Sequence, residues 1–322
     1  MSNLEVDPRE SRCGGTAEVA AAPVRELLTG RDVVLGGTRG MPVVRTLPNK
    51  HRRMVGAWCF VDHYKGHAAM HVPPHPHTAL QTVTWLLRGE VRHRDSLGSD
   101  QVIRPGQLNL MTAGQGIAHA EDSVPPEPSS LHGVQLWVAL PGSAASVAPA
   151  FAHHATLPSL VEGAVTTQLL VGSLAGEKSP AYAYTPLVGA ETSFDAQARL
   201  VLPLEPDFEY AVLTLTDGDG DTTVTVDGGP LPVGPLLYLG TGRRSVELRG
   251  GSGARLLLLG GEPFAEEMIM WWNFIGRSHD EIVAAREDWM AGRRFGPVAY
   301  EGPPLPAPEL PITQLTPKGR TR

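Results

Sequence analysis

The chain has 322 residues, of which 19% are charged, and it contains 36 glycines and 29 prolines. Its formal net charge of -7, with no lysine and arginine cluster, gives no reason to expect nucleic-acid binding or electrostatic attraction to a membrane. Many turn-forming residues and few charges favour short strands joined by tight loops, and the length allows two domains.

The N-terminal half reads as a flexible start followed by strands. Its first thirty residues lack a basic start followed by a continuous apolar core, so we expect a flexible leader over residues 1–30 and no secretory signal. Strand-like runs begin near Arg31, and "QTVTWLLRGEVRHRD", residues 81–95, alternates between two faces as a strand with a buried face does. Such runs predict a first β-domain over residues 31–141.

A stretch with little periodicity separates this domain from a second one. Residues 142–165 are rich in Ala, Ser and Pro, which predicts a connection between domains. Strand patterns separated by Gly and Asp turns then recur, and they predict a second β-domain over residues 166–300. Its weak similarity to the first half suggests duplication.

One helix is clearly marked near the C-terminus. Ser278 can cap it and Glu281 follows at the spacing of a capping box, which predicts a helix over residues 279–291 packed on the β-core. The apolar run "MIMWWNF", residues 268–274, predicts core packing just before it. The proline-rich residues 301–322 predict an extended tail.

Cysteine usage and hydropathy bear on the compartment. Cys13 lies in the polar leader and Cys59 in an apolar run, so we expect no disulfide between them. No apolar segment reaches membrane-spanning length. A reducing, cytoplasmic location without membrane contact is therefore predicted.

Histidines concentrate in the first domain, where nine of the 12 lie between His51 and His132. His75 and His77 are two residues apart, as are His119 and Glu121, and residues two apart on a strand face the same way. If these two segments pair as neighbours in a barrel, three imidazoles and one carboxylate meet inside it. That set suits a divalent iron, manganese, zinc or nickel ion.

The remaining histidines of this region carry weaker signals. We expect His93 to face solvent, and the direction of His132 stays open. Exposed loop positions are expected for His51, His63, His67 and His71. The second domain has no His-x-His pair, so it is predicted to bind no metal.

Three segments resemble the pirin family of the cupin superfamily. They are "PHPHTALQTVTWLLRGEVRHRDSLG" (74–98), "VIRPGQLNLMTAGQGIAHAE" (102–121) and "GGEPFAEEMIMWWNFIGRSHDEIVAAREDWMAGRRFG" (260–296). The resemblance covers about residues 31–300. It implies an all-β bicupin, with two jelly-roll β-barrels packed together, a short C-terminal helix and one metal in the N-terminal barrel.

The resemblance also implies a ligand set and an activity. The ligands of the family fall on His75, His77, His119 and Glu121, and Fe(II) is the expected ion, with Mn, Zn, Ni and Cu as alternatives. Since some members resemble quercetinases, we expect an iron-dependent dioxygenase acting with O2 on a flavonol-like or enediol substrate. The alternatives are a redox- or metal-sensing regulator that binds a partner protein, and a metal that only stabilises the barrel.

Position 81 departs from the pattern of the family. Pirins commonly keep a Glu four residues after the second histidine, where this chain has Gln81. Gln81 cannot accept a proton, so Glu121 would have to deprotonate the substrate as well as bind the metal. We expect Gln81 beside the ligands, where its amide would hold a water or the substrate.

Overall fold

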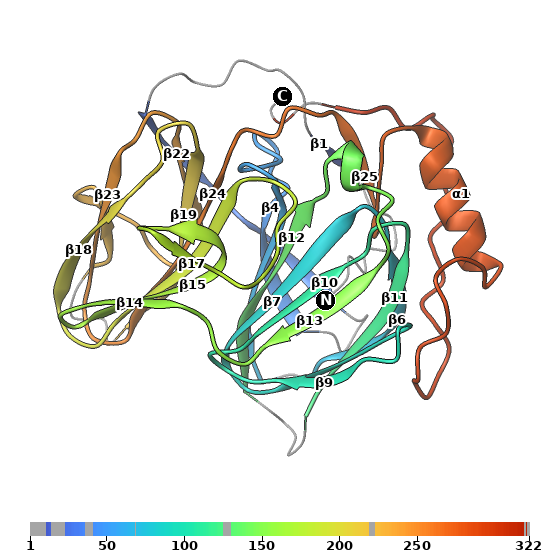
Figure 1. Ribbon diagram of the computed structural model, residues 1–322, viewed down its shortest axis with the longest axis horizontal. Helices are drawn as coiled ribbons and strands as arrows, with labels where there is room; N and C mark the ends of the chain where they lie inside the picture. The colour runs from blue at the N-terminus through green and yellow to red at the C-terminus, as the bar shows by residue number, and fades with distance from the viewer. Residues whose placement is uncertain are drawn as a thin grey trace.

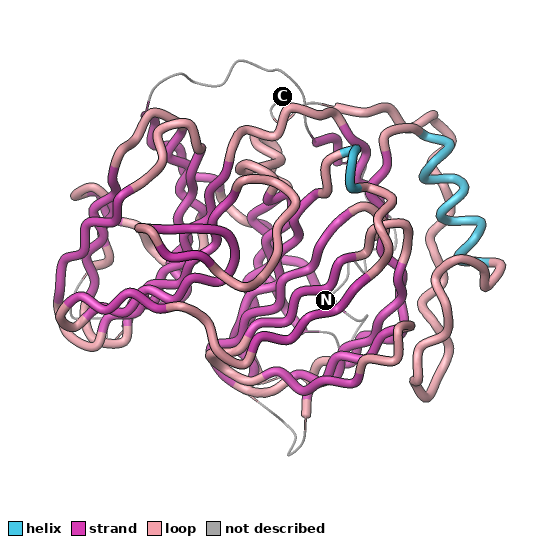
Figure 2. Tube along the Cα trace, in the orientation of Figure 1, coloured by secondary structure: helices cyan, strands magenta, loops and turns pink. Residues whose placement is uncertain are grey.

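The computed structural model describes residues 11–13, 23–35, 41–67, 69–124, 130–218, 223–318 and 320. Two β-domains lie side by side, with the N-terminal domain at the right of Figure 1 and the C-terminal domain at the left. Figure 2 shows how strongly strands dominate the described chain, whose single α-helix lies at the outer edge of the N-terminal domain. The predicted all-β architecture of two domains is thereby confirmed.

Two antiparallel sheets face each other in the N-terminal domain. The larger has the order β13 (Ala150–His154), β10 (Leu108–Thr112), β7 (Leu80–Arg88), β12 (Leu131–Ala139), β5 (Trp58–Gly66), β4 (Met41–Leu47) and β3 (Arg31–Leu35). The smaller has the order β6 (His71–His77), β11 (Ile117–Ser123), β8 (Val91–Asp95) and β9 (Asp100–Ile103). The ring of His93 in the smaller sheet stacks on that of Phe151 in the larger, with centroids 4.3 Å apart.

The C-terminal domain repeats this plan with its own apolar core. Its larger sheet has the order β14 (Ser159–Glu162), β15 (Val165–Leu174), β17 (Leu187–Phe194), β24 (Ala254–Gly261), β19 (Glu209–Asp217), β22 (Leu236–Gly240) and β2 (Pro23–Leu28), with β16 (Glu177–Lys178) paired to β15. Its smaller sheet has the order β18 (Ala198–Pro203), β23 (Ser245–Gly250), β20 (Thr225–Val226) and β21 (Gly229–Pro230).

The predicted domain boundaries need three corrections. Residues 23–28 are β2, the edge strand of the C-terminal sheet, and not part of a flexible leader. The predicted connection at 142–165 contains a short 3-10 helix, Gly142–Ala144, and also β13, a strand of the N-terminal sheet. Local sequence patterns predict each domain boundary, whereas pairing between strands distant in sequence determines where each domain begins and ends.

The third correction concerns the C-terminal segment, which returns to the N-terminal domain. β25 (Met268–Trp271), β26 (Phe274–Gly276) and β1 (Ser11–Cys13) form a small sheet there. The backbone N–H of Ile275 donates to the carbonyl of Thr78 at 3.2 Å, beside β6. The predicted burial of the apolar run 268–274 is confirmed, but its packing partner is the N-terminal domain.

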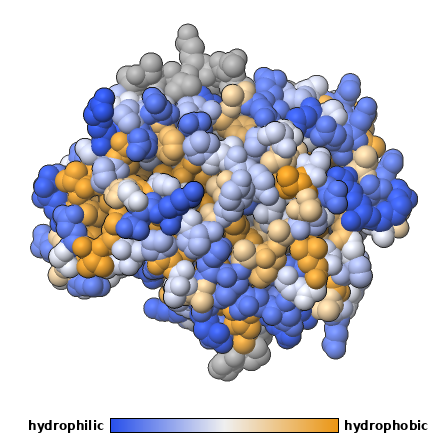
Figure 3. Space-filling view, in the orientation of Figure 1, coloured by the Kyte–Doolittle hydropathy of each residue, from blue (hydrophilic) through white to orange (hydrophobic). Residues whose placement is uncertain are grey.

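The helix α1 (His279–Met290) lies within one residue of its predicted end. The Ser278 hydroxyl accepts from the backbone N–H of Glu281, as expected for a cap. Ile282 and Ala285 are buried, whereas Figure 3 shows a mainly hydrophilic surface at this side of the molecule. The Trp289 indole donates to the carbonyl of Leu305 at 2.8 Å, so the proline-rich tail packs along the helix.

Trp58 of β5 joins the two domains. It is fully buried, and its indole N–H is shared between the carbonyls of Val188 and Gly260, each 3.1 Å away in the C-terminal domain. A Cβ on Gly189 would lie 2.8 Å from the Trp58 ring, so only glycine fits there. One apolar cluster continues through both domains at this point, which makes them a single packed unit.

Two further expectations concern cysteine and membrane. Cys59 is buried, with its Sγ 3.6 Å from the carbonyl oxygen of Trp137, while the side chain of Cys13 lies outside the described residues. No helix in the described ranges is long and apolar enough to cross a membrane.

A pair of buried histidines joins β5 to β12. His63 was expected in an exposed loop, but it is 5% exposed and its Nε2 lies 2.9 Å from that of His132. Burial, and then the Lys65 charge, lower the pKa of His63 to about 4. Burial, and then His63, lower the pKa of His132 to about 4. Both rings are therefore neutral in the folded protein near pH 7.

Acidification should destabilise the fold through this pair. Below the ordinary pKa of 6.5 the unfolded chain takes up protons that the folded pair accepts only near pH 4. The free energy of unfolding should therefore fall as pH drops from 6.5 to 4. His132→Gln should make that fall shallower by about 1 kcal/mol per pH unit near pH 5. Urea unfolding at several pH values measures the slope, and an unchanged slope in the variant would contradict the prediction.

Candidate metal centre

The two ligand-bearing segments predicted from the sequence are neighbouring strands. β6 and β11 pair antiparallel, with His75 directly opposite His119. The chain turns tightly before β11 at Gly114, whose φ is +50° and where a Cβ would lie 2.0 Å from the carbonyl oxygen of Val147. This glycine lets β10 lead into β11 at the distance that brings His119 to β6.

Three imidazoles converge between the two sheets. The ligand nitrogens of His75, His77 and His119 all lie within 4.8 Å of one another, and each residue is 0% exposed. The Nε2 atoms of His77 and His119 are 3.1 Å apart. The ring of His77 also meets Trp137 of the larger sheet edge-on, with centroids 5.1 Å apart, so the group lies in the interior of the domain.

Backbone carbonyls determine which nitrogen of two rings carries the hydrogen. The Nδ1 of His75 lies 2.9 Å from the carbonyl oxygen of Pro73, and that of His77 lies 3.2 Å from the carbonyl oxygen of Asn273. A carbonyl oxygen only accepts, so both Nδ1 atoms donate and each neutral ring keeps its lone pair on Nε2. The buried Nε2 of His75 has no hydrogen-bond partner among the described residues.

Burial keeps these rings neutral. It is the largest cause that lowers the pKa of His75 and of His119 well below 6.5, and neighbouring histidines lower both further. Burial likewise lowers the pKa of His77 to about 3. Neutral imidazoles with inward-facing lone pairs and an orphaned Nε2 fit a divalent metal ion.

Glu121 adjoins this group through His119. Its carboxylate forms a second group with His119 and His93, within which all ligand atoms again lie within 4.8 Å of one another. The register of β11 against β6 shifts between His119 and Glu121, so Glu121 lies opposite Val72 and not opposite a histidine of β6. The four predicted ligands are thus contiguous, with His119 common to both groups.

The expectation that His93 faces solvent is wrong. It is 3% exposed, because Val91, His93 and Asp95 alternate inward along β8 while Arg92 and Arg94 point outward. His93 and Asp95 are thus two polar residues of the site that the sequence analysis missed. The inward direction of the apolar Val91, two residues earlier, was the signal that could have placed them.

Gln81 is buried on β7 at 1% exposure, and its Oε1 has no hydrogen-bond partner among the described residues. Its amide nitrogen donates to the hydroxyl of Thr112 at 2.9 Å and to the carbonyl of Tyr182 at 3.0 Å. A carbonyl acceptor needs a donor opposite it, which explains an amide in place of an acid at this position. Gln81 therefore ties the C-terminal domain to β7.

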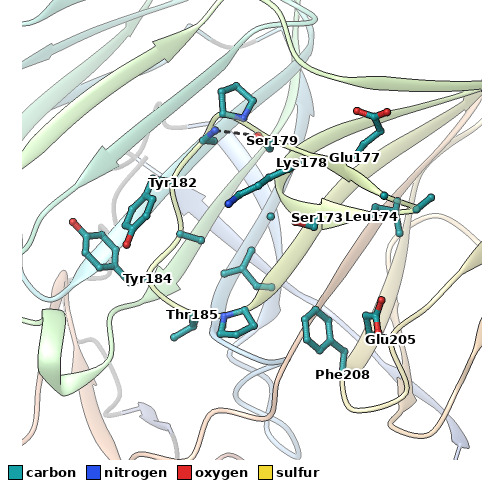
Figure 4. A pocket seen from close by; sticks show the side chains of 18 of the residues that line it. Ser173, Leu174, Glu177, Lys178, Ser179, Tyr182, Tyr184, Thr185, Glu205 and Phe208 are labelled. Atoms are coloured by element: carbon teal, nitrogen blue, oxygen red, sulfur yellow. Dashed lines mark hydrogen bonds between the residues drawn. The ribbon is translucent and has the colours of Figure 1, made fainter.

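The loop that Gln81 holds lines a cavity of about 930 Å³ in the C-terminal domain. Figure 4 shows Tyr182 and Tyr184 on one side of this cavity and Phe208 and Glu205 on the other. The two tyrosine rings meet edge-on, with centroids 4.9 Å apart. Both potential metal-binding groups found among the described residues lie in the N-terminal domain.

Two packed β-domains, one with three converging imidazoles, define a bicupin with a group able to bind a metal ion. Residues 40–138 match the pirin family and residues 189–296 match the pirin C-terminal cupin domain. The chain belongs to the pirin family, as the sequence motifs indicated.

Known relatives cover most of the chain. It is 48% identical over 291 residues to "Putative quercetin 2,3-dioxygenase PA1205" of Pseudomonas aeruginosa, covering 88% of this chain and 90% of that protein. It is 30% identical to human pirin over 256 residues, 78% of this chain and 87% of that one. A crystal structure of quercetin 2,3-dioxygenase from Acinetobacter baumannii superposes with a TM-score of 0.84 at 39% identity, covering 90% of this chain and 96% of that chain.

A substitution that introduces one negative charge at position 81 tests the contact of Gln81 with Tyr182. Gln81→Glu should lower the free energy of unfolding by about 1–3 kcal/mol, because the introduced carboxylate would face a carbonyl oxygen in a buried place. Gln168→Glu is the matched control, since Gln168 also donates to a carbonyl, that of Leu157 at 3.4 Å, but is only partly buried. Equal effects in urea unfolding would refute a special role for the Gln81 contact.

Proposed function

We propose that this chain is a metal-dependent dioxygenase of the quercetinase type, which opens a flavonol-like or enediol substrate with O2. His75, His77, His119 and Glu121 would hold the ion, with Fe(II) as the first choice. The observation that carries the proposal is the convergence of three neutral, buried imidazoles, one with an orphaned Nε2. The names of the two bacterial relatives support the substrate class.

The bound ion would supply a Lewis acid and a redox centre for a deprotonated substrate hydroxyl and O2. The protein residues have separate tasks. The imidazoles present lone pairs without needing to lose protons, since burial already keeps them neutral. Glu121 is the carboxylate of the set, so a carboxylate oxygen of Glu121 would accept the proton of the substrate hydroxyl.

The two ends of the Gln81 amide would have separate tasks: the nitrogen holds the Tyr182 loop, and the buried Oε1, which has no hydrogen-bond partner among the described residues, would accept a hydrogen bond from water or substrate. Its amide hydrogens are directed at Thr112 and Tyr182, so we propose that it positions the Tyr182 segment. The interior of the domain is closed to water around the imidazoles, which would protect an oxygen-dependent reaction from side reactions.

The same burial favours a second candidate function. Each of the three imidazoles is 0% exposed, so a bulky substrate reaches them only if the covering elements move. A redox- or metal-sensing regulator that binds a partner protein would need no such access. In that case the oxidation state of the ion would alter the surface, and the β25–β26 hairpin, whose Asn273 carbonyl accepts from Nδ1 of His77, would respond to it.

Oxygen uptake with quercetin tests the enzymatic proposal. Protein loaded with Fe(II) should consume O2 in proportion to quercetin lost, because the substrate and O2 react together. His75→Ala should reduce uptake to the level of the metal-free protein, since it removes one Nε2. His132→Gln is the control for loss of a buried histidine elsewhere in the domain. Uptake that is equal in the loaded protein and in His75→Ala would refute the proposal.

Hydrogen exchange distinguishes the regulatory alternative. A sensor should show different amide exchange over residues 268–276 in the Fe(II) and Fe(III) states, because the ion acts on that hairpin through His77. Identical exchange in both states, together with quercetin-dependent O2 uptake, would rule this alternative out.

A further inference from the structure

A chain of hydrogen bonds runs from Asp95 through His93 to His119. The Nε2 of His93 lies 3.1 Å from Oδ2 of Asp95, and its Nδ1 lies 3.3 Å from Nδ1 of His119. The other end of His119, its Nε2, faces His77 at 3.1 Å. Asp95 lies directly opposite His119 in the pairing of β8 with β11, and His93 lies opposite Glu121.

The carboxylate determines the hydrogen positions along this chain. Asp95 accepts from His93, so the hydrogen of the His93 ring is on Nε2 and its Nδ1 is an acceptor. The Nδ1 of His119 must then be the donor. This leaves the lone pair of His119 on Nε2, the atom that lies 3.1 Å from Nε2 of His77.

The opposite tautomer of His119 would block the site. With its hydrogen on Nε2, His119 would donate to the Nε2 lone pair of His77 at 3.1 Å. Two of the three lone pairs would then be lost, one to the hydrogen and one to the bond. Something must therefore select the tautomer, and carbonyl oxygens do so only for His75 and His77.

We propose that Asp95 and His93 are positioning residues that keep the Nε2 lone pair of His119 free for the metal ion. The inference rests on the proposed metal site and extends it to two residues that do not need to touch the ion. It predicts that a change at Asp95, which does not contact the ion, weakens metal binding by reversing the hydrogen positions in His93 and then in His119.

Neighbouring groups hold the side chains of Asp95 and His93 in place. The side chains of His93 and Asp95 are 4% and 0% exposed. The second carboxylate oxygen of Asp95 accepts the backbone N–H groups of Leu97 and Ser99, at 2.9 and 3.0 Å, which fixes the orientation of the carboxylate. Stacking on Phe151 at an interplanar angle of 11° fixes the ring of His93. Neither side chain can turn away without losing these contacts.

His93 has one competing role, as a direct ligand. It shares a group of potential ligand atoms with His119 and Glu121, so a second ion could bind there. The two roles differ in stoichiometry. A positioning residue leaves the number of bound ions unchanged, whereas loss of a ligand to a second ion lowers the number from two to one per chain.

Co(II) binding to the full chain tests the proposal through three variants. Asp95→Asn should weaken the affinity for Co(II) by about 10- to 100-fold. The Oδ1 atom would keep the Leu97 and Ser99 contacts, whereas the new NH₂ group would face His93 and reverse its tautomer. His93→Phe should weaken binding less, since the ring can still stack on Phe151 and no wrong tautomer is imposed. His132→Gln should bind as the wild type does.

The double variant separates positioning from packing. In the His93→Phe background, Asp95→Asn should lower the affinity for Co(II) by less than about 3-fold, because no imidazole remains to transmit the change of tautomer to His119. The readouts are affinity by competition with a chelator, ions per chain by elemental analysis, and the visible spectrum of bound Co(II). That spectrum should change in Asp95→Asn, whereas a variant that affects packing alone would lower thermal stability and leave the spectrum unchanged.

Three results would overturn the proposal. They are wild-type affinity in Asp95→Asn, additive losses in the double variant, and a fall from two ions to one in His93→Phe. A wild-type protein that binds no Co(II) would refute the metal site itself, and with it the positioning role of Asp95 and His93. If the wild type binds one ion and the variants bind it with unchanged affinity, only the positioning role of Asp95 and His93 is refuted, so the two failures can be told apart.

Discussion

Three buried imidazole Nε2 atoms that face one another are the constraint on which the structure depends. Imidazoles at 0% exposure have no water to satisfy them, so each lone pair needs a donor or a cation. The Nδ1 hydrogens of His75 and His77 are already committed to Pro73 and Asn273. Because no donor in the described part of the chain meets the orphaned Nε2 of His75, a bound cation resolves the conflict most simply.

Both ends of the chain cross between the domains, and the C-terminal crossing reaches the histidine group. The carbonyl of Asn273 that fixes His77 comes from the C-terminal segment, which returns to the N-terminal domain through β25 and β26. In the other direction, the N-terminal β2 completes the C-terminal sheet. Together with Trp58 and Gln81, these crossings tie the two domains together, and the C-terminal crossing places the Asn273 carbonyl against His77.

Local patterns were sufficient to bring the three imidazoles together but insufficient for their surroundings. The two-residue spacing of His75 and His77 predicts their common direction, since period two is a property of any strand. His93 was misplaced because Arg92 and Arg94 flank it, although the alternation that begins at Val91 turns His93 inward. The crossings of residues 23–28 and 268–276 could not be predicted, since pairing between strands far apart in sequence leaves no trace in either strand alone. The family resemblance gave the two-domain plan, but it said nothing about the contact of Gln81 with Tyr182.

X-ray absorption of the metal-loaded protein tests the central claim most directly, because multiple scattering from imidazole rings counts histidine ligands. The account predicts three imidazole nitrogens at about 2.1 Å from one ion per chain, with oxygen completing the shell. A shell with one imidazole or none, or an ion bound only by oxygen, would show that the converging histidines are not the metal centre.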